Sequence, residues 1–160
     1  MRTYDDYLRW LYKGGRPNRF ARLQNRVSAH VFAAGVMPKR AGTLEVRGRR
    51  SGQVISFPVV IADFEGERYL VSMLGPGANW VRNLEADGGR AELRHGRRER
   101  VSLVEVDPSL RAPILRRYLA LAPGARPHIP VDRRASLESF ARVAPDYPVY
   151  RIEPRANAAA

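Results

Sequence analysis

The first 38 residues carry apolar side chains at helical spacing. One apolar stripe stops at Gly14 and Gly15, which predicts a helix that ends there. Pro17 stands where a second helix would begin, because the missing N–H of proline costs nothing in a first turn. That second stripe stops at Met37 and Pro38. The stripes consist of Tyr4, Tyr7, Leu8 and Leu11, and of Phe20, Leu23, Val27, Val31 and Ala34.

From Thr43 onward, apolar and polar positions alternate, which is the period of a β-strand. Turn signals separate the alternating stretches at Arg49–Gly52, Glu65-Gly66 and His95-Gly96. Strands joined by such tight turns are antiparallel, so we expect a closed or nearly closed sheet. About six strands are predicted, over residues 43–47, 53–62, 68–74, 90–95, 98–106 and 148–152.

Short helices are predicted between and after these strands. Their apolar spacing covers residues 80–86, 109–121 and 136–143, and Ser136 is the expected N-cap of the last one. The predicted fold class is therefore α+β, a small β-barrel with two N-terminal helices and short inserted helices. Along the chain we expect a helical segment at 1–38, a barrel domain at 39–154 and a frayed tail at 155–160.

The basic residues are concentrated near the N-terminus. The 160 residues include 28 basic and 16 acidic side chains, a net charge of +12, and the first 50 residues hold 12 basic against 3 acidic ones. Such a field suits a nucleic acid, an anionic lipid surface or a polyanionic cofactor. The absence of cysteine excludes disulfides, thiolate metal sites and a cysteine nucleophile. We expect neither a signal peptide nor a membrane span, because no apolar run is long enough.

The sequence holds no complete catalytic motif. His30, His95 and His128 lie too far apart for ligand spacing, so we expect no metal site and treat them as surface or turn residues. There is no Gly-x-Ser-x-Gly elbow and no Walker loop. A protein without an evident acid, base or nucleophile either binds a ligand or lends its scaffold to a cofactor.

Two segments have the composition of an anion site. Arg49, Arg50 and Ser51 form a predicted turn whose guanidinium, hydroxyl and backbone N–H groups suit phosphate or carboxylate oxygens. Trp80 and Asn83 open a helix after a glycine-rich loop and share one face, where free N–H groups attract negative charge. The alternatives are a solvated basic hairpin tip and a core tryptophan beside a surface amide.

Residues 43–106 resemble the deazaflavin-dependent nitroreductase family of actinobacteria, one of the split β-barrel flavin and deazaflavin oxidoreductases. The matching marks are the turn Gly48–Gly52 (glycine, two basic residues, a hydroxyl residue, glycine), Pro58, and Trp-x-x-Asn-Leu from Trp80 to Leu84. The resemblance implies a split β-barrel and a cytoplasmic enzyme that uses the reduced coenzyme F420. The arginine-rich composition also suits an actinobacterial source.

The resemblance also assigns a cofactor site. The basic turn would hold the phosphate and polyglutamate tail, the strand through Pro58 would lie along the ring, and residues 72–75 would edge the ring pocket. The implied cofactor-binding residues are Arg49, Arg50, Ser51, Phe57, Pro58, Ser72, Met73, Leu74, Gly75, Trp80 and Asn83. Ile55 and Ser56 stand where the family commonly has basic residues, and Gly75–Asn79 lacks the lysine that the family often carries.

The implied reaction is hydride transfer from reduced deazaflavin to an electrophilic small molecule, namely a quinone, an enone or a nitro compound. Tyr118 and Tyr147 are the candidate proton donors, with Tyr150 as a further one and solvent as the default. Three other classes stay open. They are a split-barrel protein that carries lipid or cofactor without turnover, an FMN-dependent oxidoreductase, and a nucleic-acid binder, for which a recognition motif is missing.

The two N-terminal helices would combine an apolar stripe with a basic face, as interfacial helices do. We therefore expect peripheral association with the inner face of the cell membrane, without insertion across it. The same stripes would serve equally well to cover an open end of the barrel. The sequence leaves a homodimer open.

Overall fold

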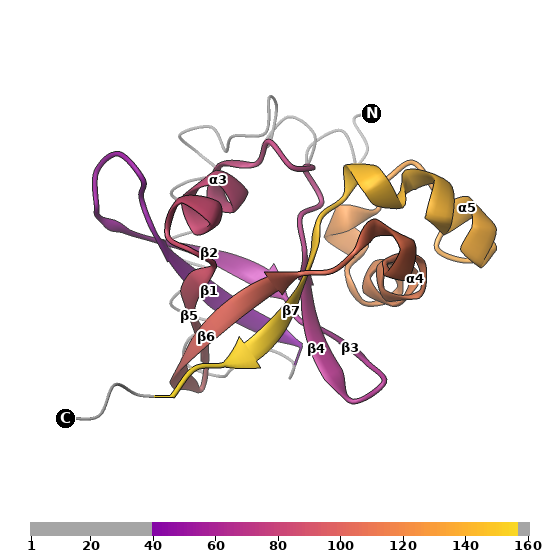
Figure 1. Ribbon diagram of the computed structural model, residues 1–160. Coiled ribbons are helices and arrows are strands. Elements are labelled where there is room, and N and C mark those ends of the chain that lie inside the picture. The colour runs from indigo at the N-terminus through magenta and orange to yellow at the C-terminus, as the bar shows by residue number, and fades with distance from the viewer. Residues whose placement is uncertain (1–39, 157–160) are drawn as a thin grey trace, which may run out of the picture.

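A curled antiparallel sheet of seven strands dominates residues 40–156, the part of the chain that the computed structural model describes (Figure 1). The hydrogen-bonded order is β2-β1-β5-β6-β7-β4-β3. The strands are β1 (Ala41–Arg47), β2 (Val54–Val60), β3 (Ala62–Phe64), β4 (Glu67–Val71), β5 (Arg90–His95), β6 (Arg97–Glu105) and β7 (Val149–Pro154). Three α-helices accompany them: α3 (Asn79–Ala86), α4 (Ala112–Leu121) and α5 (Leu137–Val143). The α+β class is confirmed, and the half-barrel is consistent with a split barrel.

One continuous segment supplies both edges of this sheet. The sequence predicts a single strand over 53–62, and this prediction is wrong, because the strand breaks at Ile61 into β2 and β3. The Ile61 N–H donates to the carbonyl of Arg40 (2.6 Å), after which the chain leaves β1 and pairs with β4. The two edges of the sheet therefore meet at Ile61, and the sheet must curl. The predicted strand at 68–74 is also shorter, since it ends at Val71.

The register of β1 and β2 decides which backbone groups face the outer edge. Gly48 N–H donates to Gln53 C=O at one end of the ladder, and Ile61 N–H donates to Arg40 C=O at the other. Between these two ends, hydrogen-bonded and non-hydrogen-bonded residue pairs alternate along the ladder. Ser56 and Pro58 belong to non-hydrogen-bonded pairs, so their backbone groups point away from β1. Pro58 thus gives up no ladder bond through its missing N–H. Among the described residues β2 has no second neighbour, so these groups lie at a free edge.

The first hydrophobic core fills the inside of the curl. The helix α3 covers one open end of it beside the β1–β2 hairpin (Figure 1) and contributes Val81 and Leu84, both almost fully buried. The strands contribute Leu44, Val46, Leu70, Ala91, Leu93, Val101, Leu103, Tyr150 and Ile152. Each such side chain stabilises the fold by about 1–3 kcal/mol through burial alone.

The second core lies on the other face of β4 and β7. Val71 and Val149 point into it and meet α4 and α5, which lie together on that side (Figure 1). The predicted helix at 109–121 divides into a 3₁₀ turn at Pro108–Leu110 and α4 from Ala112, with Pro113 in the first turn. The N-cap prediction for Ser136 is confirmed, because its Oγ accepts the N–H of Ser139 (3.2 Å).

Arg111, at the start of α4, connects the end of β6 with the turn that precedes β7. Its side chain is almost fully buried, and its Nε donates to the carbonyl of Val106 (2.8 Å). The Nη1 atom donates to the carbonyl of Ala144 (3.1 Å), and Nη2 pairs with Glu105 (3.0 Å). This guanidinium therefore holds the 3₁₀ turn Ala144–Asp146, which leads into β7, against the end of β6.

The helices predicted over 1–38 and the end of the tail, 157–160, lie outside the described residues. Within 40–156, no helix is long and apolar enough to cross a membrane.

Candidate functional site

Glycine stands at both ends of the β1–β2 turn. Gly52 has a φ of +69°, a conformation that residues with a side chain rarely adopt. A Cβ on Gly48 would stand 2.7 Å from Ser51 Oγ and 3.3 Å from the carbonyl oxygen of Gln53, so the Ser51 side chain would have to move. Ser51 Oγ faces its own turn, where it accepts the N–H of Gln53 (3.2 Å). Within this turn Arg49 is half-buried and Arg50 is exposed.

Arg49 joins this turn to α3. Its backbone N–H and its Nη1 both donate to Asn83 Oδ1, at 3.1 and 2.8 Å, and Nη1 also donates to Asn79 Oδ1 at 3.0 Å. Asn83 is buried, with 2% exposure. The two anion-site candidates in the sequence, the basic turn and the Trp80–Asn83 segment, thus lie in contact. Arg49, Arg50, Ser51, Asn79 and Asn83 are called the hairpin–α3 corner below.

The start of α3 adds further donors to this corner. The first N–H groups of a helix have no acceptor within the helix, and Ala78 at the N-cap provides no side-chain cap. No acidic residue stands in the first turn of α3, so no carboxylate there neutralises the positive end of the helix dipole. The donor set of the corner is therefore guanidinium, hydroxyl and amide N–H, which is the chemistry that phosphate oxygens require.

Trp80 lies between the edge strand and the barrel interior. Its ring centroid is 5.8 Å from that of Phe57 on β2 and 5.7 Å from that of Tyr150 on β7, the latter in an edge-on arrangement. Both Phe57 and Trp80 are half-buried against the first core. Trp80 therefore packs against the first core, as the alternative interpretation expects, and remains partly exposed.

Hydrogen bonds of Ser72 hold the loop between β4 and α3 in place. Ser72 is fully buried, its Oγ donates to the carbonyl of Gly75 (2.6 Å), and its N–H donates to the carbonyl of Pro148 (2.9 Å). Gly75 has a φ of +85°, and a Cβ there would lie 3.3 Å from the carbonyl oxygen of Asp146. Ser72 therefore shapes the loop, and the half-buried side chains of Met73 and Leu74 pack against the second and the first core, respectively.

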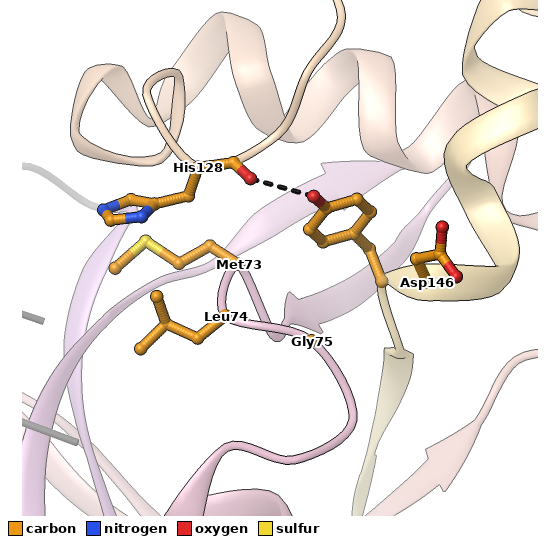
Figure 2. A pocket seen from close by; sticks show the side chains of 6 residues that line it. Met73, Leu74, Gly75, His128 and Asp146 are labelled. Carbon is orange, nitrogen blue, oxygen red and sulfur yellow. Dashed lines mark hydrogen bonds between the residues drawn. The ribbon is translucent and has the colours of Figure 1, made fainter. Parts of the chain in front are cut away.

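A cavity of about 330 Å³ opens at the β4 end of this loop (Figure 2). It is lined by Met73, Leu74, Gly75, His128, Asp146 and Tyr147, and it is called the Met73–His128 cavity below. The Tyr147 hydroxyl donates to the carbonyl of His128 (2.8 Å), and burial raises the pKa of Tyr147. Figure 2 shows the Asp146 carboxylate on the far side of Tyr147 from His128 and Met73.

Sequence reasoning named four of the six lining residues and missed His128 and Asp146. The sequence predicts a surface or turn histidine at 128, because no ligand spacing surrounds it. The signal that it carries is weak, a histidine between Pro127 and Pro130 in an irregular segment. Only the fold brings this segment against the 72–75 loop.

The tyrosines considered as proton donors occupy three different environments. Tyr118 is buried in the second core and Tyr150 in the first, and burial raises the pKa of both. The Tyr150 hydroxyl is buried and has no hydrogen-bond partner among the described residues. Of the three, Tyr147 is the one that lines the Met73–His128 cavity, so we retain Tyr147 and not Tyr118 or Tyr150 as a candidate near an acceptor.

Comparison with known proteins relates this chain to others by fold. No family model and no curated protein matches it. Among solved structures, Rv2991 of Mycobacterium tuberculosis shares 18% identity over 78% of each chain, with a TM-score of 0.55. Atu2129 of Agrobacterium tumefaciens, a protein of unknown function, shares 16% identity with a TM-score of 0.55, over 81% of this chain and 55% of its own.

A heme binding protein from Mycobacterium smegmatis also matches, with 15% identity and a TM-score of 0.51, over 80% of this chain and 51% of that one. The neighbours also include an F420-H2 dependent reductase and an F420 reductase, with 16% and 14% identity and TM-scores of 0.46 and 0.45. This chain covers only about half of Atu2129 and of the heme binding protein, so those two span more protein than it does. The similarity concerns the fold alone.

Proposed function

We propose that this protein is an F420H2-dependent reductase that passes a hydride to an electrophilic small molecule. The observation that carries the proposal is the contact of Arg49 with Asn79 and Asn83, which joins the basic turn and the start of α3 into one donor-rich corner. Both segments belong to the marks by which the sequence resembles the deazaflavin-dependent nitroreductases. The corner fits the phosphate and acidic tail of F420 because it offers donors and no acidic residue in the first turn of α3.

The free edge of β2 suits the ring of the same coenzyme. Ser56 turns both its N–H and its C=O to this edge, and Pro58 turns its C=O there. Such a row of backbone donors and acceptors can pair with the imide edge of a flavin-type ring, and Phe57 and Trp80 supply aromatic surface beside it. Bound reduced deazaflavin would supply the hydride.

The described residues would then do three things. The hairpin–α3 corner would hold the phosphate and tail, the β2 edge would orient the ring, and the Met73–His128 cavity would receive the acceptor. The loop 72–78 joins the cavity to the corner, and the internal bonds of Ser72 keep its shape. Met73 and Leu74 would exclude water from the acceptor.

Titration of the purified protein with F420 and then with FMN, followed by fluorescence, tests this function. We expect saturable binding of F420, weaker binding of FMN, and oxidation of F420H2 when a water-soluble benzoquinone is added. A protein that is yellow as purified and prefers FMN would instead be an FMN-dependent oxidoreductase.

A second candidate is a binding protein on the same barrel, without turnover. It is favoured by Ile55 and Ser56, which replace the basic residues of the family, and Ile55 is exposed at the edge of the sheet. Tight binding of F420 without reduction of any quinone, enone or nitro compound would identify this candidate.

A further inference from the structure

We propose that Ser136 is a phosphorylation site, which an arginine-directed protein serine kinase binds through Arg133 and Arg134. The site lies directly before α5, outside the hairpin–α3 corner and outside the Met73–His128 cavity. The proposal goes beyond the proposed function and does not depend on it, because its test needs neither the coenzyme nor an acceptor.

The spacing of arginine and serine is the first argument. Among the serines of residues 40–156, Ser136 is the one with arginine both two and three positions before it. Kinases select substrates largely by the charges that flank the acceptor hydroxyl, and carboxylates in a kinase cleft pair well with guanidinium groups. Ser51 also follows two arginines, but they stand one and two positions before it, and Arg49 is bonded to α3.

The two arginines before Ser136 are available to such a cleft. Arg133 and Arg134 are exposed and lie in a segment, residues 126–136, that has neither helix nor strand. Neither side chain forms an ion pair or a hydrogen bond with a described residue. The carboxylate of the neighbouring Asp132 accepts the backbone N–H of Arg134 (2.7 Å). A kinase would therefore bind both guanidinium groups without displacing a partner in the described part of the chain.

The acceptor hydroxyl can be reached by opening one helical turn. Ser136 is exposed, and Leu137 after it has 42% exposure. The first turn of α5 is held to Ser136 by the N–H groups of Ser139 and Phe140, both at 3.2 Å, and by a hydroxyl contact with Ser139 (3.1 Å). The Phe140 side chain, with 0% exposure, anchors α5 in the second core. Residues 133–137 can thus extend into a kinase cleft while this anchor stays packed.

The transfer is balanced as follows. The Ser136 oxygen attacks the γ-phosphorus of ATP bound to the kinase, so that a new O–P bond forms and the bond to the ADP oxygen breaks. The hydroxyl proton passes to the catalytic base of the kinase, and ADP is released. The phosphate carries about 1.5–2 negative charges at neutral pH, and its oxygens can accept hydrogen bonds from Arg133 and Arg134. The same two arginines therefore serve recognition first and the modified serine afterwards.

Incubation of the folded, full-length chain with MgATP and the catalytic subunit of cyclic-AMP-dependent protein kinase tests the proposal. We expect mass spectrometry to find phosphate on Ser136. Ser136→Ala should lose this phosphate, and Ser136→Thr, which keeps a hydroxyl, should still accept it. Arg133→Ala combined with Arg134→Ala should lower kcat/KM for the protein substrate by about 10²-fold or more, as two lost charge-assisted contacts do.

Arg142→Met is the matched control, because Arg142 is also an exposed arginine near the site but follows the acceptor at the end of α5. It should be phosphorylated like wild type, and thermal unfolding should show every variant folded at the assay temperature. Absence of phosphate on Ser136, phosphate there only above the unfolding midpoint, or equal rates for the double arginine variant and Arg142→Met would each overturn the proposal. A wild-type protein that binds no F420 would overturn the proposed function alone.

Discussion

The hairpin–α3 corner and the Met73–His128 cavity lie at the two ends of one loop, and they are built in different ways. Side chains that bond to side chains make the corner, where Arg49 reaches Asn79 and Asn83. Side chains that bond to backbone carbonyls make the cavity, where Tyr147 reaches His128, Ser72 reaches Gly75 and Arg111 reaches Ala144. A side-chain pair leaves a residue pattern in the sequence, whereas a carbonyl is supplied by any residue. The corner is therefore visible as a motif and the cavity is not.

The largest loss of stability should come from Arg111→Met, a substitution on the cavity side of the comparison. It removes the buried donors to the carbonyls of Val106 and Ala144, and we expect the free energy of unfolding to fall by about 3 kcal/mol. Urea denaturation measures this. The reduction of acceptors should fall as well, because the turn before Tyr147 loses its support.

The same substitution at Arg142 serves as the control. Arg142 pairs with Glu138 on the surface of α5, with side chains 72% and 78% exposed. Its loss should change stability by less than about 0.5 kcal/mol. Equal losses at the two positions would contradict the structural role given to Arg111.

The corner is broken by Arg49→Ala and Arg50→Ala, which should differ from each other. The double variant should bind F420 more weakly by about 2–4 kcal/mol, at about 1–2 for each lost charge-assisted contact. The sequence alone predicts that the fold is indifferent to both changes, because it places them on an exposed tip. In the structure this holds for Arg50, but Arg49 is half-buried and bonded to α3.

We therefore expect Arg49→Ala to lower the free energy of unfolding by about 1–3 kcal/mol and Arg50→Ala to leave it unchanged. Thermal unfolding without ligand separates the two effects from affinity. A double variant that binds F420 as tightly as wild type would remove the corner from the cofactor site.

Two tyrosine substitutions should change the free energy of unfolding by about 1 kcal/mol or less. Tyr147→Phe removes the bond to the His128 carbonyl, so stability should fall by about 1 kcal/mol and quinone reduction by no more than about tenfold. Tyr150→Phe removes a buried hydroxyl that has no partner among the described residues, and should be neutral or stabilising. Loss of about 10²-fold or more in reduction for either variant would assign the proton to that tyrosine.

The smallest effect concerns an ion pair between two strands whose residues belong to neither site. Arg68 on β4 and Glu99 on β6 form two hydrogen bonds, at 3.1 and 2.8 Å, and the guanidinium lowers the pKa of Glu99 below its ordinary value. A lowered folded-state pKa stabilises the protein above the unfolded value of about 4.3, and this contribution is lost as the pH falls through the folded value.

Glu99→Gln should therefore flatten the decline in unfolding free energy below about pH 4.3, by at most about 1 kcal/mol. F420 binding near neutral pH should not change. An acid profile identical to that of wild type would show that the pair adds nothing to stability.

Particular residues show where sequence reasoning succeeded. The Glu65-Gly66 turn has φ values of 49° and 80°, as its composition indicates for a tight hairpin, and Ser136 caps α5. These features depend on neighbours within a few positions. The break at Ile61 was not predictable, because it depends on the carbonyl of Arg40 and on the pairing of β3 with β4.

The same distinction holds in the candidate site. Arg49 and Asn83 were each selected for their chemistry, but their contact spans 34 positions and is a property of the fold. The sequence around His128 shows no ligand spacing, while the hydroxyl that donates to its carbonyl comes from Tyr147, 19 positions later. Side-chain chemistry can be read locally, and proximity cannot.

The segment 54–64, which supplies both edges of the sheet, also bears on how the chain folds. Its first half pairs with β1 through the Gly48–Gly52 turn and its second half pairs with β4 through the Glu65-Gly66 turn, so two hairpins adjoin at Ile61. Both need only short loops to close, which takes microseconds in isolated hairpins. The contacts of β1 with β5 and of β4 with β7 join residues far apart in the chain and must form more slowly. We expect folding to begin with this pair of hairpins, so that substitutions at Ile61 slow folding more than they speed unfolding.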